Sequence, residues 1–436
     1  MSRLARLEGS ARFLALVKLA NVGLVLIWGF AVTFVFVRIL PMAEFQAFLL
    51  LVAFGNFTIS AEFGLTSIIY ARLRRHWLAR AGGTDAPDDG GFRLEEMGIL
   101  FLFLGLLIAA ATLILLVGLA SGWLTTRLPL LFLLFFLSAC LNLPALLAKR
   151  ALAAVDGNFL WEGLDCARRV VTIGLLLAML AGLDPRLSLA LQLAVSIAVI
   201  GYAIAHVHRR LGMTRRHWLA FRAGGGHVRA HYLRDIGASA AFTVSDIIAY
   251  NAPYFTIAAA TGDARPMLLF DFFFKMSRAL SMLVRAMVEA ALPRITRAYH
   301  AGDTARLRQL MGRALGAALL FALGLSAMLL TAGGWLFAIL FDGRAAIDRA
   351  DIAIMILALA ALTLLSVSVY VQTALGRFGE LLLRSLPFLA GSLASAPLAL
   401  LLWPDRFDLA FLGLYALTLL GVAILHLLSL RKLLRA

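Results

Sequence analysis

Most of this chain consists of apolar segments that are long enough to cross a lipid bilayer as helices. A bilayer core of about 30 Å requires about 20 apolar residues in α-helical form. With that length as a guide, the 436 residues contain twelve candidate spans. They lie at 13–37, 45–71, 96–120, 128–148, 159–182, 187–207, 237–261, 266–291, 310–332, 350–375, 383–402 and 408–430. With 62% hydrophobic residues, the composition predicts an all-α polytopic membrane protein.

The loops between these segments alternate in positive charge. One set, which includes both termini, contains 26 Lys or Arg residues, and the other set contains 7. Positive residues are retained on the cytoplasmic side, so both termini are expected in the cytoplasm and the chain in the cell inner (cytoplasmic) membrane. The formal net charge of +16 then follows from topology. No nucleic-acid partner is expected, because the basic residues are scattered over many short loops.

The twelve spans divide evenly around one long basic segment. We expect an amino-terminal six-helix lobe at 1–208, a cytoplasmic basic linker at 209–236 and a carboxy-terminal six-helix lobe at 237–436. Three consecutive glycines, Gly224 to Gly226, predict a flexible hinge in the linker. Both halves enter the membrane in the same direction, which is typical of the parallel repeats of transporters.

Features of enzymes and metalloproteins are scarce in the sequence. The G-x-x-x-x-G-K-[ST] phosphate loop is absent, so no ATPase site is expected. Cys140 and Cys166 both lie in apolar segments, which argues against a cysteine zinc site. His227 and His231 have a spacing that a metal site could use, but the favoured interpretation is interfacial histidines on a basic linker. The chain is therefore expected not to be an enzyme, and to need no cofactor or metal.

One predicted span, "DFFFKMSRALSMLVRAMVEA", carries an unusual row of charges. Positions 271, 275, 278, 282, 285 and 289 recur every three or four residues, so they form one stripe on a helix. Five of the six are ionisable: Asp271, Lys275, Arg278, Arg285 and Glu289. A charge near the bilayer centre costs about 2.5–3.5 kcal/mol on insertion scales. This stripe is therefore expected to face water or other charged helices.

The stripe has two interpretations. Asp271 with Lys275, and Arg285 with Glu289, could pair within the helix as structural ion pairs. Arg278 would then have no partner in its own helix. It would need either a carboxylate from elsewhere or an anionic substrate. We favour the substrate, because Arg278 and Lys275 lie deep in the bilayer, where they would be of no use to a cation carrier.

Further charges lie in other predicted spans. "WEGLDCARR" places Glu162, Asp165, Arg168 and Arg169 in the cytoplasmic half of 159–182, where snorkelling to the interface is an alternative to a functional role. The predicted substrate-binding residues are Arg278, Lys275, Arg285, Arg168, Arg169 and Lys18. The predicted charge partners or coupling residues are Asp246, Asp271, Glu289 and Glu62.

Two stretches resemble a known family. Residues 37–73 are similar to the first hairpin of polysaccharide or O-antigen (Wzx-type) flippases of the multidrug/oligosaccharidyl-lipid/polysaccharide (MOP) exporter superfamily. The matching residues are Arg38, Leu40, Pro41, Glu44, Phe45, Gly64 and Leu65. Residues 333–385, with "ALGR" at the end of the tenth span, resemble the family's ninth-to-eleventh helix region. Together these stretches cover about a fifth of the chain, and the matched residues shape turns.

The resemblance implies a fold and a function. The fold would be two six-helix lobes, like that of multidrug (MATE-type) transporters, around a central cleft. The function would be to flip a polyprenyl-pyrophosphate-linked oligosaccharide to the outer leaflet by alternating access, for cell-surface polysaccharide biosynthesis. Its partners would be that glycan lipid and the bilayer, with the glycan polymerase machinery as a further partner to consider. The alternatives are a cation-coupled multidrug antiporter, an unrelated twelve-helix carrier and a membrane enzyme.

Overall fold

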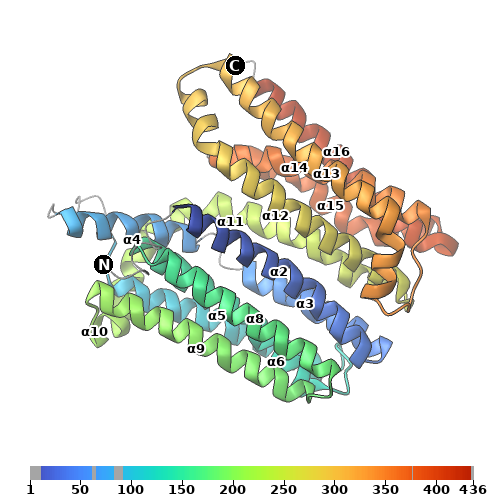
Figure 1. The fold of residues 1–436 in the computed structure, drawn as a ribbon, viewed down its shortest axis with the longest axis horizontal. Coiled ribbons are helices and arrows are strands. Elements are labelled where there is room, and N and C mark those ends of the chain that lie inside the picture. The colour runs from blue at the N-terminus through green and yellow to red at the C-terminus, as the bar shows by residue number, and fades with distance from the viewer. Residues whose placement is uncertain (1–10, 61–64, 83–91, 376, 434–436) are drawn as a thin grey trace. The chain divides into compact units, whose positions relative to one another are not determined.

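The computed structural model describes residues 11–60, 65–82, 92–375 and 377–433. Within these ranges the chain forms fifteen α-helices and one short 3-10 helix, and no β-strand (Figure 1). The helices gather into two compact units. Unit 1 comprises Met1–Leu40 and Phe54–Ala240, and unit 2 comprises Pro41–Ala53 and Ala241–Ala436. The domain boundaries at 208 and 236 remain a prediction.

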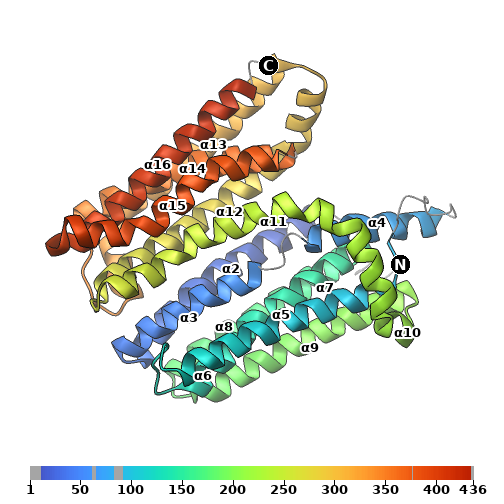
Figure 2. The ribbon, with the colours of Figure 1, turned by 180° about the vertical axis from the view of Figure 1, so that it is seen from behind.

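Unit 1 is built from α2, the last part of α3, α4 to α10 and the first part of α11. Their bounds are α2 Ala11–Ile39, α3 Met42–Ser60, α4 Leu65–Gly82, α5 Glu95–Ala120, α6 Pro129–Cys140, α7 Asn142–Ala154, α8 Asn158–Leu180, α9 Pro185–Leu211, α10 Arg215–Leu219 and α11 Phe221–Ala260. Helix α8 packs between α2 and α9, and α9 also packs against α6 and α7. Figures 1 and 2 show α5, α6, α8 and α9 running alongside one another.

Unit 2 contains the first part of α3, the remainder of α11 and all later elements. These are α12 Arg265–His300, α13 Thr304–Leu340, α14 Arg349–Ala374, α15 Phe378–Leu402, the 3-10 helix η1 Pro404–Arg406 and α16 Phe407–Leu433. Helix α16 packs against both α14 and α15, while α12 packs against α13 and α14. The charged stripe of α12 therefore belongs to a helix with packed neighbours in its own unit.

Eight helices of the described chain are long and apolar enough to cross a membrane. They coincide with eight of the twelve predicted spans. The other four predictions, 45–71, 159–182, 237–261 and 266–291, fall on α3 with α4, α8, α11 and α12. Helix α3 is short, with an apolar stretch of Met42–Thr58. Helices α8 and α12 contain the charged clusters described above, and these charges lower their hydropathy. The spanning role of these two helices is therefore supported by their length.

Local sequence explains where helix α9 begins and ends. Asp184 accepts hydrogen bonds from the backbone N–H groups of Arg186 (2.7 Å) and Leu187 (3.1 Å), and Pro185 occupies the first turn. At the other end Gly212 adopts a left-handed conformation with φ of 62°. Both signals are readable in the sequence, and they place the ends of this span within a few residues of the prediction.

The turn between α7 and α8 is tied to α4. Asp156, with φ of 64°, accepts hydrogen bonds from Arg74 Nη1 (2.6 Å) and Trp77 Nε1 (2.9 Å). Burial acts to raise the pKa of Asp156, but the two hydrogen bonds and the charge of Arg74 outweigh it and hold the pKa below its usual value. Asp156 thus connects two segments about 80 residues apart at one end of the unit 1 bundle.

The linker differs from the prediction of a flexible hinge. Gly224, Gly225 and Gly226 are helical and form part of α11. A Cβ at Gly224 would overlap the carbonyl oxygen of Glu95, and one at Gly98 would overlap the carbonyl oxygen of Trp218. Glycine is needed here because the backbones of α10 and α11 approach the first turns of α5 closely. The glycines therefore support packing of helices.

Candidate functional site

The charged stripe of α12 begins with a buried ion pair in unit 2. Asp271 is 1% exposed, and it pairs with Lys275 one turn later on the same helix. Its second oxygen accepts a hydrogen bond of 2.8 Å from the hydroxyl of Tyr254 on α11. The side chain of Lys275 is 12% exposed. The positive charge of Lys275 is therefore largely balanced within the unit.

An aromatic cluster surrounds this pair. Tyr254 stacks edge-on against Phe270 and Phe274, with ring centroids 5.0 Å and 5.9 Å away. Phe270 in turn contacts Tyr415 of α16 at 5.5 Å. The cluster consists of Tyr254, Phe270, Phe273, Phe274, Phe388, Phe411 and Tyr415. Such apolar surroundings strengthen the attraction between Asp271 and Lys275 and fix their positions.

Arg278, one turn further along α12, is in a different situation. Its side chain is exposed. Its guanidinium carbon lies 5.7 Å from the centre of the Phe274 ring, a cation–π contact. Within the described part of the chain Arg278 has no carboxylate partner and donates no side-chain hydrogen bond. Its five N–H donors are therefore available to a ligand.

The remaining stripe residues are described only in part. Arg285 is exposed, and its guanidinium carbon lies 5.9 Å from the ring of Tyr370 on α14. The side chain of Glu289 lies outside the described residues, as does Glu62. Lys18 on α2 is exposed and has no ion-pair partner in the described ranges. The predicted roles of these four residues stay predictions.

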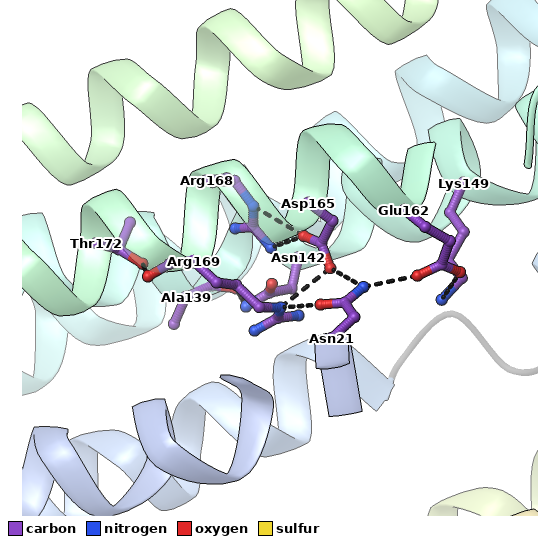
Figure 3. A network of polar contacts seen from close by, with 9 residues as sticks. All are labelled: Asn21, Ala139, Asn142, Lys149, Glu162, Asp165, Arg168, Arg169 and Thr172. Atoms are coloured by element: carbon purple, nitrogen blue, oxygen red, sulfur yellow. Dashed lines mark hydrogen bonds and ion pairs between the residues drawn. The ribbon is translucent and has the colours of Figure 1, made fainter. Parts of the chain in front are cut away.

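A second charged cluster lies in unit 1, between α2 and α8 (Figure 3). Asn21 of α2 is at its centre. The amide nitrogen of Asn21 donates to Glu162 Oε2 at 2.7 Å and to Asp165 Oδ2 at 2.9 Å. Glu162 also pairs with Lys149 of α7 at 3.4 Å. One amide side chain therefore holds two buried carboxylates in place.

Both arginines of this cluster contact Asp165. Arg168 donates from Nε (3.0 Å) and Nη2 (2.6 Å) to Asp165 Oδ1. Arg169 donates from Nε to Asp165 Oδ2 and to the Asn21 oxygen, both at 3.0 Å. Arg168 is 8% exposed. The structure therefore places these arginines in an internal network, which differs from the snorkelling arrangement that the sequence left open.

Arg169 keeps part of its guanidinium group unused. Its two terminal nitrogens make no hydrogen bond to any residue that the structure describes, and no dashed line reaches them in Figure 3. Arg168, in contrast, uses two nitrogens on one carboxylate oxygen and is buried. Of the two predicted binding residues of α8, Arg169 has more free donor capacity.

Asp246 is the predicted coupling residue of α11. It is partly buried and forms no hydrogen bond or ion pair with the described residues. Asp246 lies within electrostatic range of the hydroxyl groups of Tyr250 and Tyr415. Asp246 was also among the predicted charge partners, but the structure shows no ion pair between Asp246 and Arg278.

Sequence reasoning missed two polar residues that organise these clusters. Asn21 is an isolated amide in an otherwise apolar predicted span, and Tyr254 is a hydroxyl one turn beyond Tyr250. Both are buried, at 5% and 1% exposure. An uncharged polar residue inside a predicted span was the signal that could have identified both residues. A buried hydrogen-bond donor in hydrocarbon needs a partner.

The chain is similar to known proteins in its structure. No protein-family model matches the sequence, and no curated protein matches it. An inward-facing multidrug resistance MATE family transporter of the MOP superfamily is similar, with TM-score 0.65, 14% identity, and 97% of this chain and 98% of that chain covered. A MATE transporter from Vibrio cholerae gives a TM-score of 0.57 at 16% identity, with 99% and 98% covered.

A third similar structure is a MOP superfamily transporter from Pyrococcus furiosus, for which reverse polarity of the binding pocket suggests a different function. Its TM-score is 0.64 at 12% identity, with 97% of this chain and 95% of that chain covered. The matches extend over nearly the full length of every chain compared, although sequence identity is low. The predicted fold class is therefore confirmed: the chain is an all-α polytopic membrane protein with the fold of MATE transporters of the MOP superfamily.

Proposed function

We propose that this chain is a MOP superfamily transporter that translocates a polyprenyl-pyrophosphate-linked oligosaccharide across the cytoplasmic membrane by alternating access. The observation that carries the proposal is Arg278, an exposed residue on a charged membrane helix, whose guanidinium has no carboxylate partner among the described residues. A cation at this depth is costly without an anion nearby. A pyrophosphate group would supply that anion during transport.

The chemistry of the groups available supports an anionic cargo. A guanidinium donates paired hydrogen bonds to phosphate oxygens, which suits Arg278 and the free terminal nitrogens of Arg169. Lys275 contributes less net charge, because Asp271 neutralises it. Each unit therefore contributes, from a predicted span, an arginine with donors that the described residues leave unused. Both termini in the cytoplasm, as the loop charges predict, would orient the transporter for export of the glycan lipid.

A cation-coupled multidrug antiporter is the second candidate. It is favoured by Asp246, a partly buried carboxylate with no ion-pair partner in the described chain, and by the multidrug transporters among the similar structures. The Pyrococcus furiosus protein is described as having a binding pocket of reverse polarity. A binding pocket of reversed polarity on this fold supports considering an anionic cargo here.

Replacement of Arg278 tests the proposed cargo. Arg278→Ala should reduce export of the lipid-linked glycan by about 10- to 150-fold, because a hydrogen-bonded charge contact contributes about 1.5–3 kcal/mol. Arg278→Lys should restore export only in part, since an ammonium group lacks paired donors. The measurement is surface glycan in a strain that depends on this gene, normalised to the amount of protein in the membrane.

A matched control lies on the same helix. Arg297 is also an exposed arginine of α12, but it lies outside the predicted span, and Arg297→Ala should leave export unchanged. Full export by Arg278→Ala would remove Arg278 from the mechanism. Resistance to cationic drugs that is lost in Asp246→Asn and kept in Arg278→Ala would instead favour the multidrug antiporter.

A further inference from the structure

The segment that joins α9 to α11 is strongly and uniformly basic. We call residues 212–229 the α9–α11 connector; it includes α10 and the first two turns of α11. No acidic residue occurs between Asp184 and Asp235, so no carboxylate near in sequence neutralises it. Its arginines are Arg215, Arg216, Arg222 and Arg229. Topology rules require positive loops, but they do not require the apolar side chains that accompany them here.

The connector exposes both charge and apolar surface. All four arginines are exposed, and none forms an ion pair with another described residue. Between them Leu219 is 69% exposed and Phe221 is 37% exposed. Exposed leucine and phenylalanine side by side with unpaired arginines are the pattern of segments that lie in the headgroup region of a membrane.

The connector is also held firmly at the end of membrane-spanning helices. Its neighbours α9, which ends at Leu211, and α5, which begins at Glu95, are both long and apolar enough to span. Trp218 donates from Nε1 to His208 Nδ1 (3.0 Å) and packs on Phe101 with ring centroids 5.5 Å apart. In both Figures 1 and 2, α10 lies at the end of α9 within unit 1.

We propose that the α9–α11 connector is a binding surface for anionic phospholipid headgroups of the adjacent leaflet. The arginines bind the lipid phosphates, while Leu219 and Phe221 insert among the acyl chains close to the headgroups. Close approach of α5 to the backbones of α10 and α11, through Gly98 and Gly224, keeps the surface in one orientation. This surface is independent of the cargo and would be present in a flippase or an antiporter.

Lipid is favoured over a soluble anion because two kinds of contact coincide. Free phosphate would engage the arginines but gain nothing from Leu219 and Phe221. The span ends of α5 and α9 place the connector beside the membrane interface. Arginine near a membrane surface adds to the binding of acidic lipid, and the attraction falls off within a Debye length.

Titration of the full-length protein with two lipids tests the proposal. The protein is delipidated in an uncharged detergent, and its melting temperature is followed as dioleoyl-phosphatidylglycerol or dioleoyl-phosphatidylcholine is added. Half-maximal stabilisation by the anionic lipid should need about fivefold more lipid for each arginine removed. The test variant is R215Q/R216Q/R222Q, which should not affect folding because these side chains are exposed and unpaired in the described structure.

The control variant removes the same amount of charge elsewhere. R186Q/R349Q/R406Q replaces three exposed arginines at the first turn of α9, the start of α14 and η1. It should keep the wild-type response to phosphatidylglycerol. The variant L219S/F221S should weaken the response to the lipid without changing the response to inorganic phosphate. Equal effects of both lipids, or equal losses in the two arginine variants, would overturn the proposal.

Discussion

Asp271 and Lys275 can be interpreted either as an ion pair that stabilises the fold or as residues that bind substrate. The two interpretations predict different effects of substitution. Asp271 is fully buried and accepts from both Lys275 and Tyr254, so its removal leaves a buried ammonium group without an anion. Asp271→Asn should therefore lower the free energy of unfolding by about 3–5 kcal/mol. The measurement is thermal or denaturant unfolding of the purified protein in detergent.

A double variant separates stability from transport. D271N/K275M removes both charges of the pair and should recover most of the lost stability, because no unpaired charge remains. If D271N/K275M is as unstable as D271N alone, the pair is not what stabilises this part of unit 2. A stable double variant that still exports glycan would restrict substrate binding on α12 to Arg278 and Arg285.

Single-residue predictions from the sequence succeeded where the helix period alone determines geometry. The four-residue spacing of Asp271 and Lys275 predicted a possible pair, and the pair is formed. The same spacing could not show that Tyr254 of α11 also contacts Asp271, or that Asn21 of α2 joins Glu162 to Asp165. Those contacts depend on how separate helices pack against one another. The periodicity of a single helix carries no information about that packing.

The contact between α5 and α10 gives a prediction for a helical element. A Cβ at Gly98 would overlap the backbone carbonyl of Trp218, and a carbonyl cannot move aside as a flexible side chain can. Gly98→Ala should therefore destabilise the protein by about 1–3 kcal/mol, the usual cost of overpacking. It should also loosen the α9–α11 connector, which limited proteolysis near Trp218 would detect.

Gly105, on the same helix, is the matched control. A Cβ there would have no atom within 4 Å, so Gly105→Ala should gain up to about 1 kcal/mol from the higher helix propensity of alanine. Opposite signs for the two substitutions are expected in the same unfolding assay. A neutral Gly98→Ala would mean that α10 is not packed against α5 as the structure has it.

Whole helices were predictable where hydropathy identifies a long apolar segment. Eight predicted spans correspond to helices that are clearly long and apolar enough. Helices α8 and α12 were expected as spans because of their length, although their charges lower the apolar signal. The glycines of the linker illustrate the limit. Composition there indicates flexibility, whereas tertiary contact with Glu95 makes Gly224 part of a packed helix.

At the scale of the whole molecule, the distribution of charge follows the loops. The set of loops predicted to be cytoplasmic has 26 basic residues against 7 in the other set. This asymmetry predicts an orientation, and with it the direction in which an anionic cargo would move under the membrane potential. The helix bounds are the same whichever side is cytoplasmic, so orientation and energetics must be tested on the intact protein in a membrane.

Membrane potential should act directly on the proposed cargo. With the inside negative, outward movement of one negative charge is favoured by about 2.3 kcal/mol per 100 mV, about a 50-fold change in distribution per charge. The test uses proteoliposomes with a potassium diffusion potential set by valinomycin and a glycan lipid accessible to an added glycosidase. Accumulation should follow the positive side and reverse with the potential, and Arg278→Ala should slow approach to both distributions. If transport does not depend on the sign of the potential, a co-transported or exchanged cation cancels the charge of the cargo. Asp246 would then be the first residue to replace.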